Sequence, residues 1–125
     1  MFKLFQIRPS REQCDRVNEL GWTQAFEEMP IIEAWQAVGR GGSEAYVTEY
    51  DQYFEHVADI AVDSLEAAFH AHNIEDESKI TRYGSQHSMS VGDVLVDEFG
   101  GVHMCDNIGF TQIMSSFIGS NQKVA

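Results

Sequence analysis

The sequence predicts an α+β fold, in which a small, mostly antiparallel sheet of four or five strands carries helices packed on one face. Two observations lead to this prediction. Short apolar segments separated by glycine turns follow one another between residues 94 and 113, as is typical of antiparallel strands. Helical spacing of apolar residues behind serine caps occurs in two other parts of the chain. Both kinds of element are expected to share one core.

The chain begins with a predicted strand over residues 2–7. Apolar side chains occur at both odd and even positions of this segment, which favours a central strand that is partly buried on both faces. Pro9 ends the strand. Ser10 and Gln13 have the spacing of a capping box, so a helix is predicted from there to Gly21.

Two further helices are predicted over residues 22–29 and 31–38, separated by Pro30. The glycines from Gly39 onward end the second of them. This glycine-rich segment follows no strand and lacks the Lys-Ser/Thr end of a phosphate-binding loop, so it is interpreted as a flexible turn.

Residues 45–73 fit two patterns. Apolar spacing allows one long amphipathic helix, whereas residues 54–62 also alternate with the period of a strand. The sequence Asp63-Ser64-Leu65-Glu66 is typical of a helix N-terminus, and an N-terminus in the middle of one long helix is inconsistent. We therefore predict a strand over 54–62 and a helix over 64–72, followed by a polar connection over 74–86.

The C-terminal half contains the clearest pattern of strands. A β-branched and aliphatic run at 94–96, a glycine turn at 99–101 and a returning segment at 102–105 predict a hairpin. The apolar segment 110–113 after Gly109 predicts a third strand. Gly92 is placed in a tight entry to the hairpin, where φ > 0 is accessible to it.

The same region carries the motif H-S-x-S-V-x-D-V, followed by a hairpin turn and C-D-x-x-G-F. Together with the preceding strand and short helix, these motifs make residues 53–113 resemble the YodL-like domain. The resemblance implies a small accessory protein, or a module of a larger one, carried by phages, plasmids and other mobile elements. It implies no settled biochemical activity. The matching positions are His87, Ser88, Ser90, Val91, Asp93, Val94, Asp106, Gly109 and Phe110.

The length of 125 residues suits one domain, predicted over 1–114, with a small-residue tail over 115–125. No apolar run is long enough to span a membrane, and no signal peptide is recognised at residues 1–8. Cys14 and Cys105 are far apart in the sequence and are expected to be free thiols. These features predict a cytoplasmic protein, in the host cytoplasm if a phage encodes it.

Charge is the strongest compositional feature. The chain has 20 acidic and 8 basic residues, for a net charge of −12, and residues 41–78 contain no lysine or arginine. Such a surface repels phosphate backbones and attracts basic surfaces. It also confers solubility, which is an alternative explanation for the acidic composition. The sequence therefore disfavours direct nucleic-acid binding and predicts a host protein with a basic surface as partner.

Acidic side chains of the window between residues 44 and 77 are the predicted partner-binding residues. They are Glu44, Glu49, Asp51, Glu55, Asp59, Glu66, Glu75, Asp76 and Glu77. The predicted function is that of a non-catalytic accessory protein that binds and modulates or inhibits a host protein, in host takeover or anti-defence, by nucleic-acid mimicry among other routes. No cofactor, metal or catalytic residue is expected.

Two alternatives belong to other functional classes. His87, His103 and Cys105 have the side-chain chemistry of a metal or hydrolytic site, although they lack closely paired ligand spacings. The segment Val91-Gly92-Asp93-Val94 followed by a Gly-Phe strand is similar to small RNA-binding barrels of the PUA and ASCH type. Ser88, Ser90, Asp93 and Asp106 are otherwise interpreted as turn and strand-entry residues.

Overall fold

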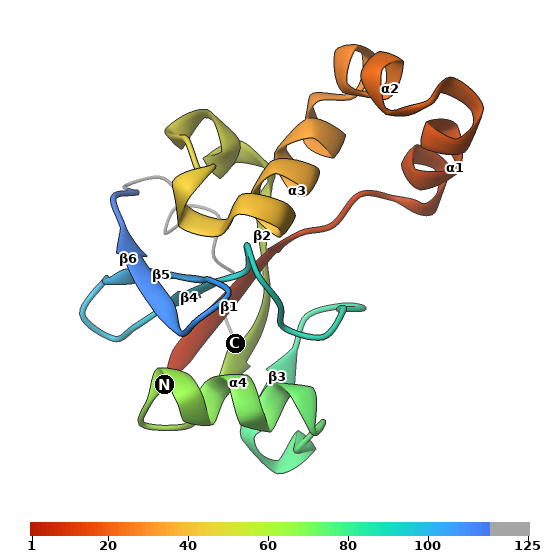
Figure 1. The fold of residues 1–125 in the computed structure, drawn as a ribbon. Helices are drawn as coiled ribbons and strands as arrows, with labels where there is room; N and C mark the ends of the chain where they lie inside the picture. Colours follow the sequence, from red (N-terminus) through yellow and green to blue (C-terminus); the bar gives the residue numbers. More distant parts are fainter. Residues whose placement is uncertain (116–125) are drawn as a thin grey trace.

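One six-stranded sheet forms the centre of the computed structural model, which describes residues 1–115 (Figure 1). The strand order is β3-β2-β1-β4-β5-β6, and every neighbouring pair is antiparallel. The strands are β1 (Phe2–Ile7), β2 (Phe54–Ile60), β3 (Ile80–Arg82), β4 (Val94–Val96), β5 (Val102–Cys105) and β6 (Phe110–Ile113).

These strands confirm the α+β class and the antiparallel sheet, with six strands where four or five were predicted. The extra strand is β3, which lies inside the segment predicted as a polar connection. β3 and β6 are the two edges of an open sheet. The alternative prediction of a small barrel is therefore wrong, because a barrel would pair these edges.

β1 lies inside the sheet between β2 and β4, as its apolar residues at both parities predicted. Leu4 and Phe5 follow each other and are both 0% exposed, so their side chains are buried on opposite faces. A bulge between them shifts the register with β2 from Leu4↔Ala58 to Phe5↔His56. Two separate core clusters result, one containing Leu4 and the other Phe5.

Helices α1 (Arg11–Leu20), α2 (Trp22–Glu28) and α3 (Pro30–Gly41) follow β1. Ser10 and Gln13 form the predicted capping box at the start of α1. α1 and α2 pack against α3 and extend away from the sheet (Figure 1), so the three helices form an arm with a small core of its own. We call residues 11–41 the helical arm.

α3 joins this arm to the body of the protein. Ala34 and Val38 of α3 pack with Phe5 and Val94 of the sheet, while Ile32 packs within the arm. α3 continues to Gly41, beyond the predicted end at 38. Two short 3₁₀ helices, η1 (Gly42–Glu44) and η2 (Thr48–Tyr53), then lead the chain back to β2.

α4 (Leu65–Asn73) follows β2 and packs on the cluster that contains Leu4. Ser64 is its N-cap, as predicted, and the Oγ of Ser64 accepts a hydrogen bond from the Ala67 amide at 3.1 Å. β2 ends at Ile60, two residues before the predicted end. The short helix η3 (Glu77–Lys79) precedes β3.

The hairpin and the last strand have the predicted bounds, with β4, β5 and β6 at 94–96, 102–105 and 110–113. None of the helices within residues 1–115 has the length and apolar character needed to cross a bilayer. The predicted C-terminal tail lies, apart from Ser115, outside the described residues.

Candidate functional site

A cleft lies between α3 and the loop that connects β3 to β4. Its volume is about 350 Å³, at the lower end of the range for ligand sites. α3 contributes an aromatic and a basic side chain, Trp35 and Arg40, and the loop contributes His87, Ser90 and Asp93. Three polar residues of the sequence motif at 87–93, namely His87, Ser90 and Asp93, therefore line one cavity.

Gly92 brings the loop into contact with α3. Its φ is +94°, and a Cβ at this position would lie 2.7 Å from the carbonyl carbon and oxygen of Val38. Only glycine allows both this backbone conformation and this close approach. The loop is also tied to the sheet, because the Gly92 amide donates to Cys105 O at 2.9 Å and the Cys105 amide donates to Asp93 O at 2.8 Å. Backbone contacts to α3 and to β5 therefore fix the position of the loop that lines the cleft.

A buried polar network forms the inner end of the cleft. Asp93 is 5% exposed, and its Oδ2 accepts hydrogen bonds from Gln6 Nε2 at 3.1 Å and from the Ser90 amide at 3.0 Å. Gln6 Nε2 also donates to His87 O at 2.9 Å. His87 Nδ1 lies 3.7 Å from Asp93 Oδ2. The network thus joins β1 to a loop 81 residues further along the chain.

Burial raises the pKa of Asp93 to about 7, and the nearby His87 and the hydrogen bonds from Ser90 and Gln6 only partly offset this effect. A carboxyl group that titrates near neutrality inside a cleft is a typical feature of functional sites. Its chemistry is that of a proton acceptor or of a partner for a cation.

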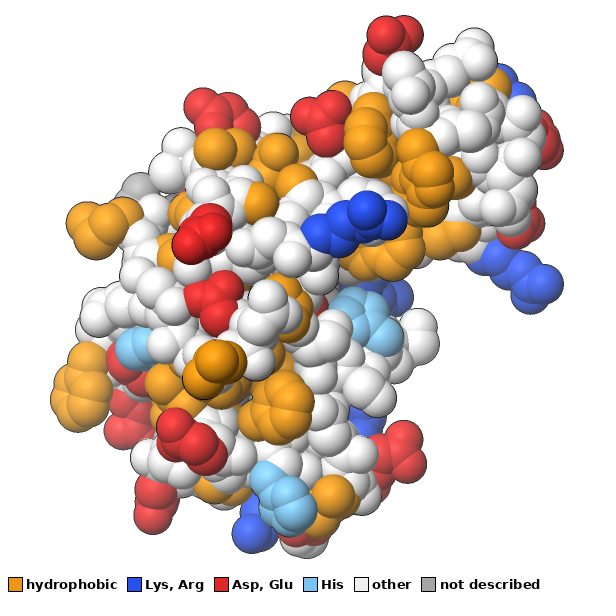
Figure 2. Space-filling view, in the orientation of Figure 1, with side chains coloured by type: hydrophobic (Ala, Val, Ile, Leu, Met, Phe, Trp, Pro, Cys, Tyr) orange, Lys and Arg blue, Asp and Glu red, His pale blue; other side chains and the backbone are white. Residues whose placement is uncertain are grey.

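Arg40 and His87 lie at the mouth of the cleft. Arg40 lies in the last turn of α3 and is exposed, and the His87 side chain is 41% exposed. Figure 2 shows a notch between the helical arm and the body, with blue basic and pale-blue histidine side chains gathered around it. The cleft therefore combines a buried carboxyl group with an arginine and a histidine at its rim, in a molecule with a net charge of −12.

The predicted acidic residues do not form one exposed surface. Asp51 and Asp59 are only 4% and 6% exposed, so these two cannot contact a partner and their assignment is wrong. Asp59 accepts hydrogen bonds inside the body from His56 and Tyr83, at 2.7 and 2.6 Å. Sequence composition does not distinguish such internal carboxylates from exposed ones.

Three other residues of the predicted set are exposed or partly exposed but already have a cationic partner. Glu55 lies 3.8 Å from Arg8, and Asp76 lies 3.9 Å from Lys79. Glu77 pairs with Arg82 at 2.7 Å. Four members remain exposed and form no ion pair within the described residues: Glu44, Glu49, Glu66 and Glu75.

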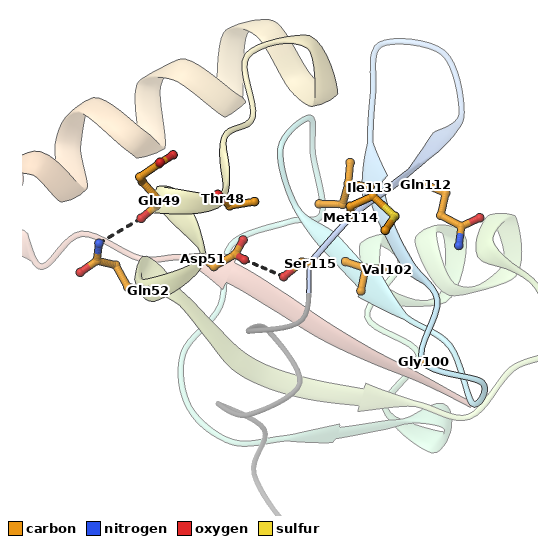
Figure 3. Close-up of a pocket in the computed structure, with 10 residues that line it drawn as sticks. All are labelled: Thr48, Glu49, Asp51, Gln52, Gly100, Val102, Gln112, Ile113, Met114 and Ser115. Carbon is orange, nitrogen blue, oxygen red and sulfur yellow. Dashed lines mark hydrogen bonds between the residues drawn. The ribbon is translucent and has the colours of Figure 1, made fainter.

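A larger cavity of about 600 Å³ lies between η2 and the strands β5 and β6 (Figure 3). Val102, Ile113 and Met114 give it apolar walls. Its one buried carboxylate, Asp51, is engaged by Tyr46 Oη at 2.5 Å and by Ser115 Oγ at 2.7 Å. Both oxygens of the Asp51 carboxylate thus have a donor inside the protein, in contrast to Asp93 in the cleft below α3.

The alternative site of His87, His103 and Cys105 is not assembled. The three residues line three different cavities, and His103 Nε2 is paired with Asp97 at 2.8 Å. Within residues 1–115, no three His, Cys, Asp or Glu side chains are arranged to hold a metal ion. Burial raises the pKa of the Cys105 thiol to about 11, which disfavours its nucleophilic form.

Two structural roles were missed in the sequence. Asp106 accepts hydrogen bonds from the Ser43 amide and hydroxyl at 2.8 and 2.7 Å and from the Thr111 hydroxyl, so it fastens η1 to the last hairpin. Gln6 is a polar residue inside an apolar strand and is 0% exposed. Such a residue indicates a buried hydrogen-bonding partner, and this was the available signal for the network at Asp93.

In comparisons with known proteins, no protein-family model, no curated protein and no solved structure matches the chain.

Proposed function

We propose that this protein is a non-catalytic binding protein whose exposed acidic side chains associate with a basic surface of a partner protein. The observation that carries the proposal is the set of exposed carboxylates without cationic partners within the described residues: Glu44, Glu49, Glu66 and Glu75. They lie in a stretch of 38 residues, from 41 to 78, that contains no lysine or arginine. Unpaired surface charge of one sign attracts a surface of the other sign and accelerates association.

One of these carboxylates, Glu49, and Glu33 of α3 lie near an aromatic side chain that a partner can contact. Tyr50 of η2 is partly exposed, and burial raises its pKa, with further contributions from the charges of Glu33 and Glu49. Glu33 of α3 and Glu49 of η2 therefore act on the same phenol group. Tyrosine flanked by charge is a frequent composition of protein interfaces.

The proposal keeps the biological setting that the YodL-like resemblance implies. An accessory protein of a phage or other mobile element acts inside the host cytoplasm and modulates or inhibits a host protein there. This activity requires a basic groove on the partner. It does not require that the carboxylates match the spacing of the phosphates in a nucleic acid. The separated His87, His103 and Cys105 side chains give no support to a hydrolytic or metal-dependent alternative.

The test is capture of host proteins by charge-reversed variants of the immobilised chain. A variant with Glu44→Lys, Glu49→Lys and Glu66→Lys is expected to bind the captured protein about tenfold more weakly than the parent chain, because it removes attraction and adds repulsion. All three side chains are exposed, so the fold is expected to persist, as circular dichroism would verify.

The matched control reverses three exposed acids of α1, with Glu12→Lys, Asp15→Lys and Glu19→Lys, and changes the net charge by the same amount. Retained capture by the control and loss in the first variant would support the proposed surface. Equal loss in both would show that capture depends on total charge alone, and unchanged capture in both would reject the acidic surface.

A further inference from the structure

The carboxyl group at the inner end of the cleft has one oxygen without a hydrogen bond. Both donors of the network, Gln6 Nε2 and the Ser90 amide, bind Asp93 Oδ2. Asp93 Oδ1 accepts no hydrogen bond from the residues that the structure describes, although Asp93 lines the cleft. A buried carboxylate is expensive unless a cation or several donors compensate it. The free oxygen is therefore available to a donor that enters the cleft.

Gln6, which donates to Asp93 from β1, carries a buried acceptor without a donor. Its side chain is 0% exposed, and Oε1 has no hydrogen-bond partner among residues 1–115. Turning the amide over would not relieve this, because Oε1 would then face two other acceptors, His87 O and Asp93 Oδ2. Gln6 therefore has no hydrogen to spare for Asp93 Oδ1, and a ligand with N–H groups would supply that donor from the cleft.

Trp35 provides an aromatic wall in the same cavity. A cation beside an indole face is stabilised by the quadrupole of the ring, and the planar guanidinium group stacks on aromatic rings more readily than an ammonium group does. Guanidinium also presents five N–H donors and is more weakly hydrated than ammonium. The carboxylate and the indole thus together favour arginine over lysine.

We propose that this cleft binds one arginine side chain of the basic partner, with the guanidinium group placed between the Asp93 carboxylate and the Trp35 indole. The inference rests on the proposed function and names its anchoring contact. The volume of about 350 Å³ accommodates a single side chain, and the alkyl part of arginine would lie against Ile7 and Val38, which also line the cleft.

The charges around Asp93 make this binding dependent on pH. Because burial raises the pKa of Asp93 to about 7, the ionised form that attracts guanidinium gains population between pH 6 and pH 8. Arg40 on α3 and the imidazole of His87 on the loop are the basic side chains at the cleft. Cys105 on β5 stays neutral in this range, since its pKa is raised to about 11. Affinity for arginine is expected to rise with pH in this window.

The direct test is a fluorescence titration with Nα-acetyl-arginine amide as probe. Trp22→Phe leaves Trp35 as the single tryptophan, so the emission reports on the cleft. We expect saturable binding with a Kd on the order of 1 mM, as for a small fragment. Nα-acetyl-citrulline amide has nearly the same shape without the charge and should not bind. Equal response to both compounds, or to neither, would overturn the proposal.

Two variants then test whether the charges of the cleft determine its affinity for arginine. Asp93→Asn, made in the Trp22→Phe chain, should weaken arginine binding about tenfold and remove its dependence on pH. Arg40→Gln removes a cation from the mouth and should strengthen arginine binding. If Arg40→Gln instead weakened arginine binding, repulsion from the mouth of the cleft would not govern the affinity, and the proposal would be wrong.

Capture of the partner separates this inference from the proposed function. Loss of capture on Asp93→Asn, with a folded chain, would support the cleft as the anchor. Capture that is unchanged by Asp93→Asn but lost on reversal of Glu44, Glu49 and Glu66 would overturn the inference and leave the proposed function standing. Capture insensitive to every one of these changes would reject the proposed function itself.

Discussion

At the scale of single residues, the effect of Asp93 on stability has a definite sign. Its pKa is raised to about 7 in the folded chain, mainly by burial, whereas an unfolded aspartate has a pKa of about 3.9. The folded state therefore binds more protons between these two values. The contribution of Asp93 to stability is fully present below about pH 4 and is lost as the pH rises through about 7.

Asp93→Asn should remove this dependence. Asparagine keeps an oxygen for the Ser90 amide but does not ionise, so the variant should gain stability relative to the parent as the pH rises. The difference between their unfolding free energies should change by on the order of 2 kcal/mol between pH 5 and pH 8 in favour of the variant. Urea denaturation at several pH values measures this change.

Asp106→Asn is the matched control for this prediction. Burial opposes ionisation of Asp106, but the hydrogen bonds from Thr111 and Ser43 outweigh it and lower the pKa of Asp106. Asp106 is thus ionised in both the folded and the unfolded state above pH 5, and its substitution should cost the same stability throughout the range. A parallel pH profile for Asp93→Asn and the parent would contradict the role assigned to burial.

At the scale of elements, the sequence was most informative where local chemistry decides the structure. The capping box of Ser10 and Gln13, the N-cap Ser64 and the three C-terminal strands were all predictable, because caps and glycine turns act within a few residues. β3 was not predictable in this way. It has three residues at the edge of the sheet, and only Ile80 is buried, so there is no alternation to detect.

The candidate site depends on contacts that local patterns do not encode. The 87–93 motif was recognised in the sequence, but its polar residues were interpreted as turn residues. Their partner Gln6 lies 87 residues before Asp93, and Val38 of α3 closes the cleft over Gly92. Likewise, the burial of Asp51 and Asp59 arises from tertiary packing and overturned part of an assignment based on composition alone.

The helical arm is expected to unfold separately from the sheet. Ile32 is 0% exposed and packs with Val17 and Ala25 inside the arm, whereas Ile60, also 0% exposed, packs in the core below the sheet. Ile32→Ala should therefore accelerate hydrogen exchange mainly in α1 and α2. Ile60→Ala should lower the global unfolding free energy by about 2–5 kcal/mol and accelerate exchange across the sheet.

Hydrogen exchange followed by mass spectrometry distinguishes these outcomes, because the two substitutions remove the same atoms from equally buried positions. Faster exchange of α1 with unchanged exchange of β1 in the Ile32 variant would establish the arm as a separate unit. Similar acceleration of α1 and β1 would mean that the arm and the sheet unfold together. A separable arm would allow the cleft beneath α3 to adjust when a partner binds.

At the scale of the whole molecule, charge influences stability as well as recognition. A net charge of −12 on 125 residues repels itself more strongly in the compact state than in the expanded chain. Salt weakens this repulsion, because the screening length falls from about 30 Å at 0.01 M to about 8 Å at 0.15 M. Raising NaCl over this range at pH 7.5 should therefore stabilise the folded protein by about 1 kcal/mol and raise Tm by about 4 °C.

The same increase in salt should have almost no effect near pH 4.6, where the sequence predicts zero net charge. Scanning calorimetry at the two pH values therefore separates screening of net charge from general effects of salt on proteins. An equal rise in Tm at both pH values would assign the effect to salt exclusion instead. A rise confined to pH 7.5 would mean that repulsion among the unpaired carboxylates lowers stability. A bound basic partner would relieve the same repulsion that salt relieves. Tm should therefore be much less sensitive to salt when the partner is bound.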